Sequence, residues 1–442
     1  MQKKRNQKKV TRKNSLGVLL LLTLFVISSF CINCRADEQT VEVNKTNFPS
    51  IVFRKYIFKN IDKNYDGELS QKEMEKVKYI SLWKSGKNGV DSYKKVDLKG
   101  INYFKNLKEL NAYAQDYQNL ELLSRQEKLK DICFYSDEQK EWEIPEIKSL
   151  KNLTVDDEDI QRIDLSKNSQ LEKVKLINHS NRKLKLNLRE NKKLKKIDIT
   201  SKSKRKTKLD FSNNNRLEAV RLDIRYGKIV WPEKNRIKRL KISNREKKSK
   251  KLILENNKKL QELYIYNKYN SKMSFDFSEN IRLRTVHLNT KYSKIIWPKK
   301  NYIKELKITN RYKKNVTLNL EKNTRLKELY VNNKYNSKMS FDFSKNKKLR
   351  TVYLNTQFSK IIGPEKGKIK SLCITVRQKD RQMVLNNIRG VKKFELEFNG
   401  KNNIEKLMVL GCPNLESVYI YGKGKLKNIE LSQLNNLECT FI

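Results

Sequence analysis

The sequence predicts a solenoid of stacked β-strand coils with a small helical cap at its N-terminal end. The segment LYIYNKYNSKMSFDFSENIRLRTVHLNTKYSKIIWP begins at Leu263, and a near-copy, LYVNNKYNSKMSFDFSKNKKLRTVYLNTQFSKIIGP, begins 66 residues later at Leu329. Repetition at a fixed period is typical of proteins built one unit at a time, in which each unit packs only on its neighbours. Function is therefore expected on the faces of the stack.

Each 66-residue block divides into three coils. The pattern apolar-x-x-apolar-x-apolar starts at Leu260, Leu283, Ile303 and Leu326, at intervals of 23, 20 and 23 residues. Its fourth and sixth positions alternate with period two, which indicates a strand. Because units this short cannot bury their own apolar side, the leucines of adjacent coils are expected to pack on one another.

An asparagine marks the return turn of many coils. In this turn it is expected to hydrogen-bond backbone groups locally. It stands three residues before the first apolar position in seven coils, as Asn168, Asn191, Asn214, Asn257, Asn280, Asn323 and Asn346.

These columns resemble secreted bacterial leucine-rich-repeat proteins of the Firmicutes type. In that family S-K-N-x-x-L-x-x-L-x-L is a familiar phrase, and this chain has it nearly verbatim at 166–176 and 344–354. The resemblance implies a leucine-rich-repeat solenoid over residues 98–442. The family also keeps an asparagine shortly after the strand, and no regular asparagine ladder is expected there. Only Asn267, Asn289, Asn333 and Asn355 lie near that place.

The first 36 residues predict a signal peptide. Residues 1–15 carry seven basic side chains and no acid, an apolar run from Leu16 to Phe30 follows, and Cys34-Arg35-Ala36 offers small residues for cleavage. The alternative is an uncleaved anchor, because residues 16–32 form an apolar stretch near the lower length limit of a membrane-spanning helix. Both readings place the repeats in an extracellular or cell-surface location.

The sharpest chemical motif precedes the repeats. Residues 62–73, DKNYDGELSQKE, match the twelve-residue calcium loop of an EF-hand, with Gly67 at the sharp turn. The alternative is a metal-free turn between helices at 51–61 and 71–80. The calcium ligands would be Asp62, Asn64, Asp66, the backbone carbonyl of Glu68 and both carboxylate oxygens of Glu73.

The segment 37–97 also resembles the helical N-terminal cap of the same family. The family phrases F-P, F-R-x-Y-I and L-K-G-I-x-Y-F-x-N-L correspond to Phe48-Pro49, 53–57 and 98–107. A cap is needed because the first coil would otherwise expose its edge and core. With the signal peptide predicted at 1–36, the resemblance implies a cap with an EF-hand-like loop at 37–97 and the solenoid at 98–442. Any bound calcium would then be structural.

The chain is strongly basic, with 99 Lys and Arg against 49 Asp and Glu and a net charge of +50. Such a surface attracts polyanions through forces that salt weakens. Because the export signal argues against nucleic acid, the expected partners are an anionic cell-wall polymer, a glycan or a protein. Membrane contact is expected only through an uncleaved anchor. The alternative is that lysine is simply the soluble residue of solvated edges.

The outward positions of the strands form the candidate binding face. Positions three, five and seven of L-x-x-L-x-L-x point away from the core, and tyrosines there lie in register with lysines. Such a face could stack on sugar rings and pair with acidic substituents, although tyrosine is also a good strand former. The candidate ligand-binding residues are Lys241, Tyr264, Tyr266, His287, Lys307, Tyr330 and Tyr353.

No catalytic set is recognisable in the sequence. The histidines, His179 and His287, lie in different coils, and the cysteines have no disulfide or zinc spacing. The sequence therefore predicts a binding or adhesion protein that is not an enzyme. The alternative is a structural spacer whose charge adheres to the cell envelope.

Overall fold

The computed structural model describes residues 40–441 except 83–92, 246–251, 268–271, 311–317, 334–338, 357, 365, 367–368, 377–379, 399–402 and 433–437. The predicted signal peptide lies outside the described residues. No helix in the described part of the chain has the length and apolar character needed to span a membrane.

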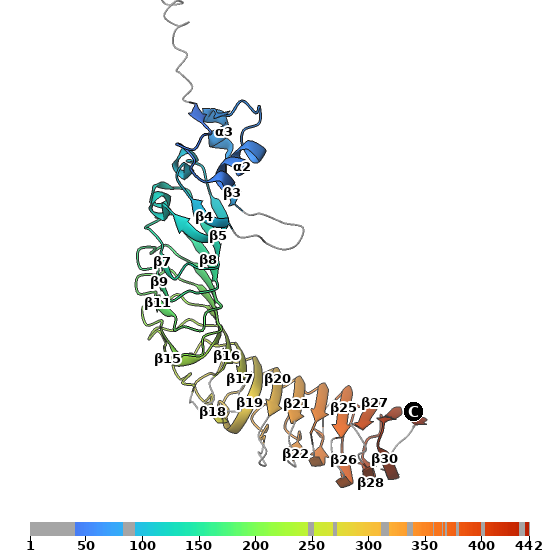
Figure 1. Cartoon of the computed structure of the whole chain (residues 1–442). Coiled ribbons are helices and arrows are strands. Elements are labelled where there is room, and N and C mark those ends of the chain that lie inside the picture. Colours follow the sequence, from blue (N-terminus) through green and yellow to red (C-terminus); the bar gives the residue numbers. More distant parts are fainter. Residues whose placement is uncertain are drawn as a thin grey trace, which may run out of the picture.

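One parallel sheet runs along the concave side of an arc-shaped solenoid (Figure 1), which confirms the predicted fold class. Each strand pairs in register with the coil before and after it, as in Leu240 with Leu263 and Ile242 with Ile265. The strands after the cap are β5 (Glu109–Gln118), β6 (Asp131–Ser136), β8 (Asn152–Asp157), β10 (Lys173–Asn178), β12 (Lys196–Ser201), β14 (Ala219–Ile224), β16 (Arg239–Asn244), β17 (Glu262–Asn267), β19 (Thr285–Ile296), β20 (Glu305–Asn310), β21 (Glu328–Asn333), β23 (Thr351–Asn355), β25 (Ser371–Val376), β27 (Lys393–Phe398), β29 (Ser417–Gly422) and β31 (Glu438–Phe441).

A second column of strands covers the convex side (Figure 1). It consists of short parallel sheets, and the C-terminal half of β19 joins one of them by pairing with β18. The column contains β7 (Glu141–Glu143), β9 (Arg162–Asp164), β11 (Lys185–Asn187), β13 (Thr207–Asp210), β15 (Tyr226–Val230), β18 (Lys272–Asp276), β22 (Met339–Asp342), β24 (Phe358–Ile362), β26 (Asp380–Asn386), β28 (Asn403–Leu410) and β30 (Lys425–Ser432).

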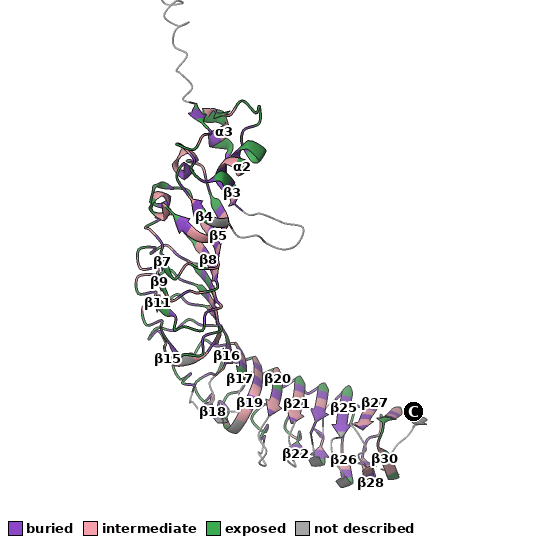
Figure 2. Ribbon diagram, viewed as in Figure 1, coloured by how far each residue is buried: buried purple, intermediate pink, exposed green. Residues whose placement is uncertain are grey.

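The core fills the space between the two columns and follows the solenoid as a continuous buried band (Figure 2). The concave strands contribute aliphatic side chains such as Leu263 and Ile265, whereas the convex column contributes rings. Phe277 is fully buried, and its ring centroid lies 5.7 Å from those of both Phe275 and Trp297. Each coil is therefore stabilised by the coils on either side of it.

Five of the seven return-turn asparagines tie neighbouring coils together, whereas the Nδ2 atoms of Asn257 and Asn323 have no hydrogen-bond partner among the described residues. Asn346 Nδ2 donates to the carbonyls of Leu320 (3.0 Å) and Asn323 (2.9 Å) in the preceding coil, and Asn280 repeats this contact one block earlier. The prediction of local bonding was therefore wrong, because the side-chain amide reaches across the coil boundary to backbone carbonyls that also accept N–H groups within their own turn.

A second buried polar column follows the concave strands, contrary to expectation. The column is not recognisable as a regular asparagine ladder, because it lies one residue beyond the seventh position of L-x-x-L-x-L-x and because Ser, Asp and Thr share it with asparagine. Its buried members are Ser136, Asp157, Asn178, Ser201, Asn244, Asn267, Thr290, Asn310, Asn333 and Thr356.

The cap contains β1 (Val41–Glu42), α2 (Ile51–Asn60), β2 (Glu68–Leu69) and α3 (Gln71–Lys76), followed by β3 (Tyr79–Leu82) and β4 (Tyr93–Asp97). The second predicted helix was expected to reach residue 80 but ends at Lys76, because Val77 is extended and the chain continues into β3. Both β3 and β4 pair in parallel with β5. The concave sheet therefore begins N-terminal to residue 98, and the 3-10 turns η1 (Ile101–Tyr103) and η2 (Leu120–Arg125) follow.

Aromatic rings join the cap to the first coil. The buried ring of Phe48 lies 5.4 Å from Phe53 and 6.3 Å from Phe104, measured between centroids. Gly100 has a φ of 94°, and a Cβ atom there would overlap the Phe48 ring. Glycine at this place thus permits both the left-handed backbone and the close approach of the cap.

Candidate functional site

Six of the seven candidate ligand-binding residues form one row across the concave sheet. Each pairs with the next in strand register, and the row crosses β16, β17, β19, β20, β21 and β23. Because neighbouring strands lie about 4.8 Å apart, the row is about 24 Å long. In chain order it consists of Lys241, Tyr264, His287, Lys307, Tyr330 and Tyr353, and Tyr266 lies two residues beyond Tyr264 on β17.

The middle of this row is a hollow of about 290 Å³, which we call the concave hollow. Six of the candidate residues line it, together with Asn289 and Thr309. Tyr353 is not in the lining, but it stacks on Tyr330 with centroids 4.5 Å apart and ring planes 3° from parallel. The strand register thus gathers the candidate residues in one place, while their role in ligand binding stays a prediction.

Glu305, which is not in the lining, contacts two residues of the concave hollow. Glu305 Oε1 lies 2.6 Å from Lys307 Nζ and 3.0 Å from His287 Nε2. The hydrogen bond from Lys307 lowers the pKa of Glu305 despite its partial burial, and the same contact raises the pKa of Lys307. Both groups are therefore charged at neutral pH.

Sequence reasoning missed Glu305. It occupies position three of the same strand as Lys307, two residues earlier and on the same face, so the period-two rule could have found it.

Rings and hydrogen-bonding groups alternate around the concave hollow. Tyr264 meets His287 edge to face, with centroids 4.7 Å apart and an interplanar angle of 81°. Burial raises the pKa of Tyr264, so its phenol keeps its proton and can donate a hydrogen bond. Tyr266, which also lines the concave hollow, is 40% exposed. The chemistry available is ring stacking together with a few fixed polar contacts.

The row continues beyond Tyr353 to Cys373 on β25. Burial, with Glu395 and Glu397 nearby, raises the pKa of this thiol to about 11. Because a protonated thiol is a poor nucleophile, Cys373 lacks the activation expected of a catalytic cysteine.

The loop at residues 62–73 has a tightly turned backbone held by its own carboxylates. Tyr65 and Gly67 have positive φ angles of 60° and 81°. Asp62 is fully buried, and its two carboxylate oxygens accept hydrogen bonds from the N–H groups of Tyr65 (2.7 Å) and Gly67 (3.1 Å). Antiparallel pairing of β1 with β2 braces the loop in the absence of a second EF-hand among the described residues.

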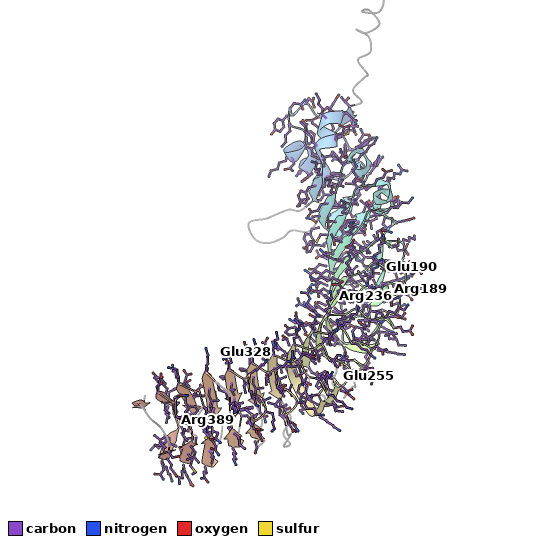
Figure 3. All side chains as sticks on the ribbon, turned by 180° about the vertical axis from the view of Figure 1, so that it is seen from behind. Arg189, Glu190, Arg236, Glu255, Glu328 and Arg389 are labelled. Atoms are coloured by element: carbon purple, nitrogen blue, oxygen red, sulfur yellow. The ribbon has the colours of Figure 1, made fainter. Side chains whose placement is uncertain are left out.

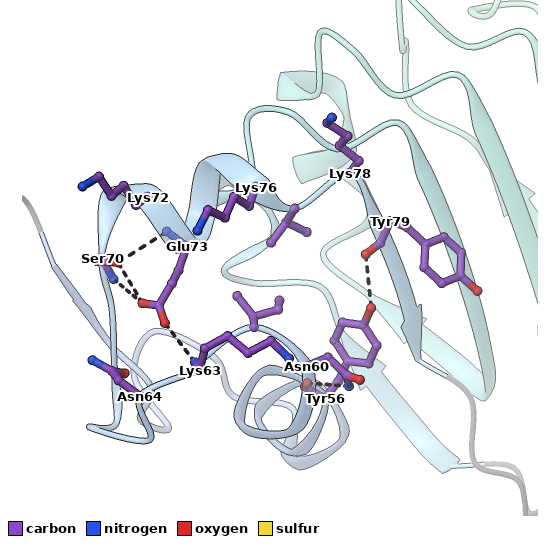
Figure 4. Close-up of a pocket in the computed structure, with 12 residues that line it drawn as sticks. Tyr56, Asn60, Lys63, Asn64, Ser70, Lys72, Glu73, Lys76, Lys78 and Tyr79 are labelled. Carbon is purple, nitrogen blue, oxygen red and sulfur yellow. Dashed lines mark hydrogen bonds between the residues drawn. The ribbon is translucent and has the colours of Figure 1, made fainter.

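Glu73 closes this loop onto α3. Its carboxylate accepts hydrogen bonds from the N–H groups of Lys63 (2.9 Å) and Ser70 (3.0 Å) and completes a capping box (Figure 4). Burial opposes ionisation, but these hydrogen bonds outweigh it and lower the pKa of Glu73. A hollow of about 670 Å³ lies beside the loop and extends to Tyr56 and Tyr79.

The donor set partly fits a calcium ion. Asp62, Asn64, Asp66, the Glu68 carbonyl and Glu73 are oxygen donors at the spacing that calcium uses. Their carboxylates now accept backbone N–H groups, however, and no three Asp, Glu, His or Cys side chains converge as a metal cluster in the described ranges. To bind calcium, the Glu73 carboxylate would have to give up its hydrogen bond from the Lys63 N–H group. The ion would then act only as a cross-link within the loop.

Solved structures with similar folds are leucine-rich-repeat proteins. They include an internalin (inlF) from Listeria monocytogenes, with 17% identity, coverage of 73% of this chain and 94% of that chain, and a TM-score of 0.49. A leucine-rich-repeat protein of Leptospira interrogans, LIC12759, has 16% identity, coverage of 83% and 93%, and a TM-score of 0.43. The functional domain of InlJ from Listeria monocytogenes has 15% identity, coverage of 79% and 83%, and a TM-score of 0.36. No protein-family model and no curated protein matches the chain.

Proposed function

We propose that this protein is an exported, non-catalytic binding protein whose concave hollow holds a glycan with acidic substituents. The observation that carries the proposal is the row of tyrosines in register with His287 and Lys307 over one hollow. Tyrosine faces can stack on sugar rings, and Lys241 and Lys307 can pair with acidic groups. Solenoids commonly bind partners on an extended concave surface. The basic, apolar and small-residue order of residues 1–36 supports export.

Replacing Tyr264, Tyr330 and Tyr353 together by serine is expected to weaken glycan binding at least tenfold, because each ring contributes about 0.5–1.5 kcal/mol. The measurement is binding to an array of acidic glycans at physiological salt, followed by titration of the best ligand. The control is the triple change Lys228→Gln, Lys294→Gln and Lys360→Gln, which removes three exposed lysines of the convex column. Equal loss in both variants, with folding intact by circular dichroism, would contradict a role for the tyrosine row.

The second candidate function is a structural spacer that adheres to the envelope through its charge. The net charge of +50 favours it. On this reading binding weakens with the number of lysines removed, wherever they lie, and disappears as salt screens the field. The lysine control above should then lose more binding than the tyrosine variant, which removes no charge, and this difference separates the two functions.

We propose in addition that the loop 62–73 binds one structural calcium ion through Asp62, Asn64, Asp66, the Glu68 carbonyl and Glu73. The ligand spacing, the turn at Gly67 and the β1–β2 brace support the proposal. Extracellular modules of this type bind calcium at about 0.1–1 mM. The ion would stabilise the end of the solenoid that the cap protects.

Glu73→Gln is expected to abolish the calcium effect while keeping the cap folded, because glutamine can still complete the capping box. In the parent chain, 5 mM calcium should raise the free energy of cap unfolding by about 1–2 kcal/mol. Thermal unfolding and calorimetry of the full chain check this. Glu75→Gln, which removes a neighbouring acid of α3, is the control. An equal calcium shift in Glu73→Gln, or none in the parent, contradicts the proposal.

A further inference from the structure

A strip of exposed basic side chains follows the edge at which the chain enters the concave sheet. Its members stand immediately before and after the first buried apolar residue of each coil, from the coil of Ile237 to that of Ile369. We call this strip the edge track. It consists of Arg236, Lys238, Lys259, Arg282, Arg284, Lys304, Arg325, Lys327, Lys348, Arg350 and Lys370.

The backbone holds the edge track at a fixed spacing. Lys327 N donates to Lys304 O (2.8 Å), Arg350 N to Lys327 O (2.8 Å) and Lys370 N to Arg350 O (2.7 Å). The apolar residue between the two basic positions is fully buried in the coils of Ile303, Leu326 and Leu349. Successive coils are therefore about 4.8 Å apart, and seven coils give a track about 29 Å long.

The edge track contains no acid. Its two remaining described positions are Gln261 and Tyr302, and Arg325 lies over the Tyr302 ring with its Cζ atom 4.2 Å from the centroid. Within the described residues, only Lys238 of the track has an acidic partner, Glu218 at 3.1 Å. The next position along the strand carries Glu262, Glu305 and Glu328, of which Glu305 is bound by Lys307 and His287. The other ten cations of the track are exposed and form no ion pair among the described residues, so an anion bound along the track would stabilise them.

The geometry selects the shape of the partner. Eleven cations over about 29 Å correspond to about one positive charge every 2.6 Å. Figure 3 labels Arg236, where the edge track begins, and Glu328, the residue after Lys327. The course of the edge track along the solenoid can be followed between these two residues (Figure 3). A flexible chain can follow this curved line. Apart from Tyr302, the track offers no ring on which a sugar could stack, so contact depends on closely spaced anionic groups.

We propose that the edge track binds a flexible linear polymer of phosphate groups, at a surface distinct from the concave hollow. Arginine and lysine both bind phosphate, the first through its planar fork and the second as a point charge. Because the coils fix the positions of the backbone, the cations lose less freedom on binding than side chains on unsupported turns. The proposal goes beyond glycan binding and does not depend on it.

The test uses fluorescently labelled inorganic polyphosphate and the full chain. The triple variant Lys304→Gln, Lys327→Gln and Lys370→Gln is expected to weaken binding at least tenfold at low salt. It should also reduce the slope of log affinity against log salt by about 2, since each phosphate contact on a single strand contributes about 0.7. The matched control is again Lys228→Gln, Lys294→Gln and Lys360→Gln, which removes the same charge from the convex column and should change affinity less than twofold. Circular dichroism verifies that both variants are folded.

Two expected outcomes support the proposal, and three others would overturn it. Polyphosphate chains too short to span the edge track should bind more weakly than those that span it. Beyond that length, the affinity per binding site should not increase further. The tyrosine variant should bind polyphosphate normally, so failure of the glycan proposal leaves this result intact. Equal loss in the two lysine variants, no polyphosphate binding by the parent at low salt, or equally tight binding of a heparin fragment of the same charge would overturn the proposal.

Discussion

Replacing Phe277 by alanine is expected to lower the free energy of unfolding by about 3–5 kcal/mol, the usual cost of removing a buried ring. The residue is fully buried between Phe275 and Trp297, at the junction of β18 with the C-terminal half of β19. A solenoid is stabilised mainly by contacts between adjacent coils. The loss should therefore uncouple the unfolding of the coils C-terminal to β19 from that of the coils before it. It should also open the concave hollow, which lies on the concave side of the same coils.

Hydrogen exchange resolved along the chain measures this effect, together with denaturant unfolding. Exchange should accelerate first in β17, β19 and β20, before it does in the cap. Ile281→Ala is the matched control, because this side chain lies in the same coil and is 47% exposed. A change above about 1 kcal/mol in the control, or uniform loss of protection along the chain, would contradict the role given to the ring cluster.

Solenoid stability is also expected to decrease as the pH rises from about 4 to about 7, because of Asp157. Burial raises the pKa of this carboxyl to about 7, although hydrogen bonds from Asp159 N and Trp142 Nε1 oppose the shift. In the unfolded chain the pKa of the Asp157 carboxyl is about 3.9. Between about pH 3.9 and pH 7 the unfolded chain therefore binds fewer protons than the folded chain does. The stabilisation by the neutral carboxyl is complete below about pH 4 and is lost by about pH 7. Over this range the free energy of unfolding should fall by up to about 4 kcal/mol.

Asp157→Asn tests the assignment through the slope of stability against pH. The variant should have a flatter slope between pH 4 and pH 7 than the parent, whatever its absolute stability. Glu158→Gln, which removes a 59% exposed acid next to it, should keep the slope of the parent. If the parent and Asp157→Asn have the same slope, the buried carboxyl does not titrate in this range.

The repeat allowed the fold class and the outward row to be predicted from sequence. Both follow from periodicity alone, because the spacing of Leu260, Leu283 and Ile303 fixes which side chains share a face. Interactions between coils were harder to predict. The contact of Glu305 with His287 depends on side-chain directions across a strand pair, and the contact of Asn346 depends on where the previous turn places its carbonyl groups.

In the cap, too, local features could be predicted from sequence but contacts between segments could not. The spacing of residues 62–73 predicted the turn, but it gave no hint that β1 would brace it. The end of α3 was misplaced because helical periodicity continues past Lys76, while pairing of β3 with β5 requires an extended chain. Signal cleavage and calcium binding stay predictions.

The two 66-residue blocks stack in the same strand register but differ in the side chains that they present. Tyr264 of the first block has its equal in Tyr330, but His287 is replaced by Tyr353 and Glu305 by Ser371 in the second block. The scaffold has thus been copied while the ionic contacts of the concave hollow occur in one copy. A duplicated unit of this kind lengthens a solenoid without any change in its two ends. The outward side chains of one copy can then change and bind a second ligand. The stacked pair of Tyr330 and Tyr353 lies in the second block, beside the concave hollow, and is the place where such divergence would change what the protein binds.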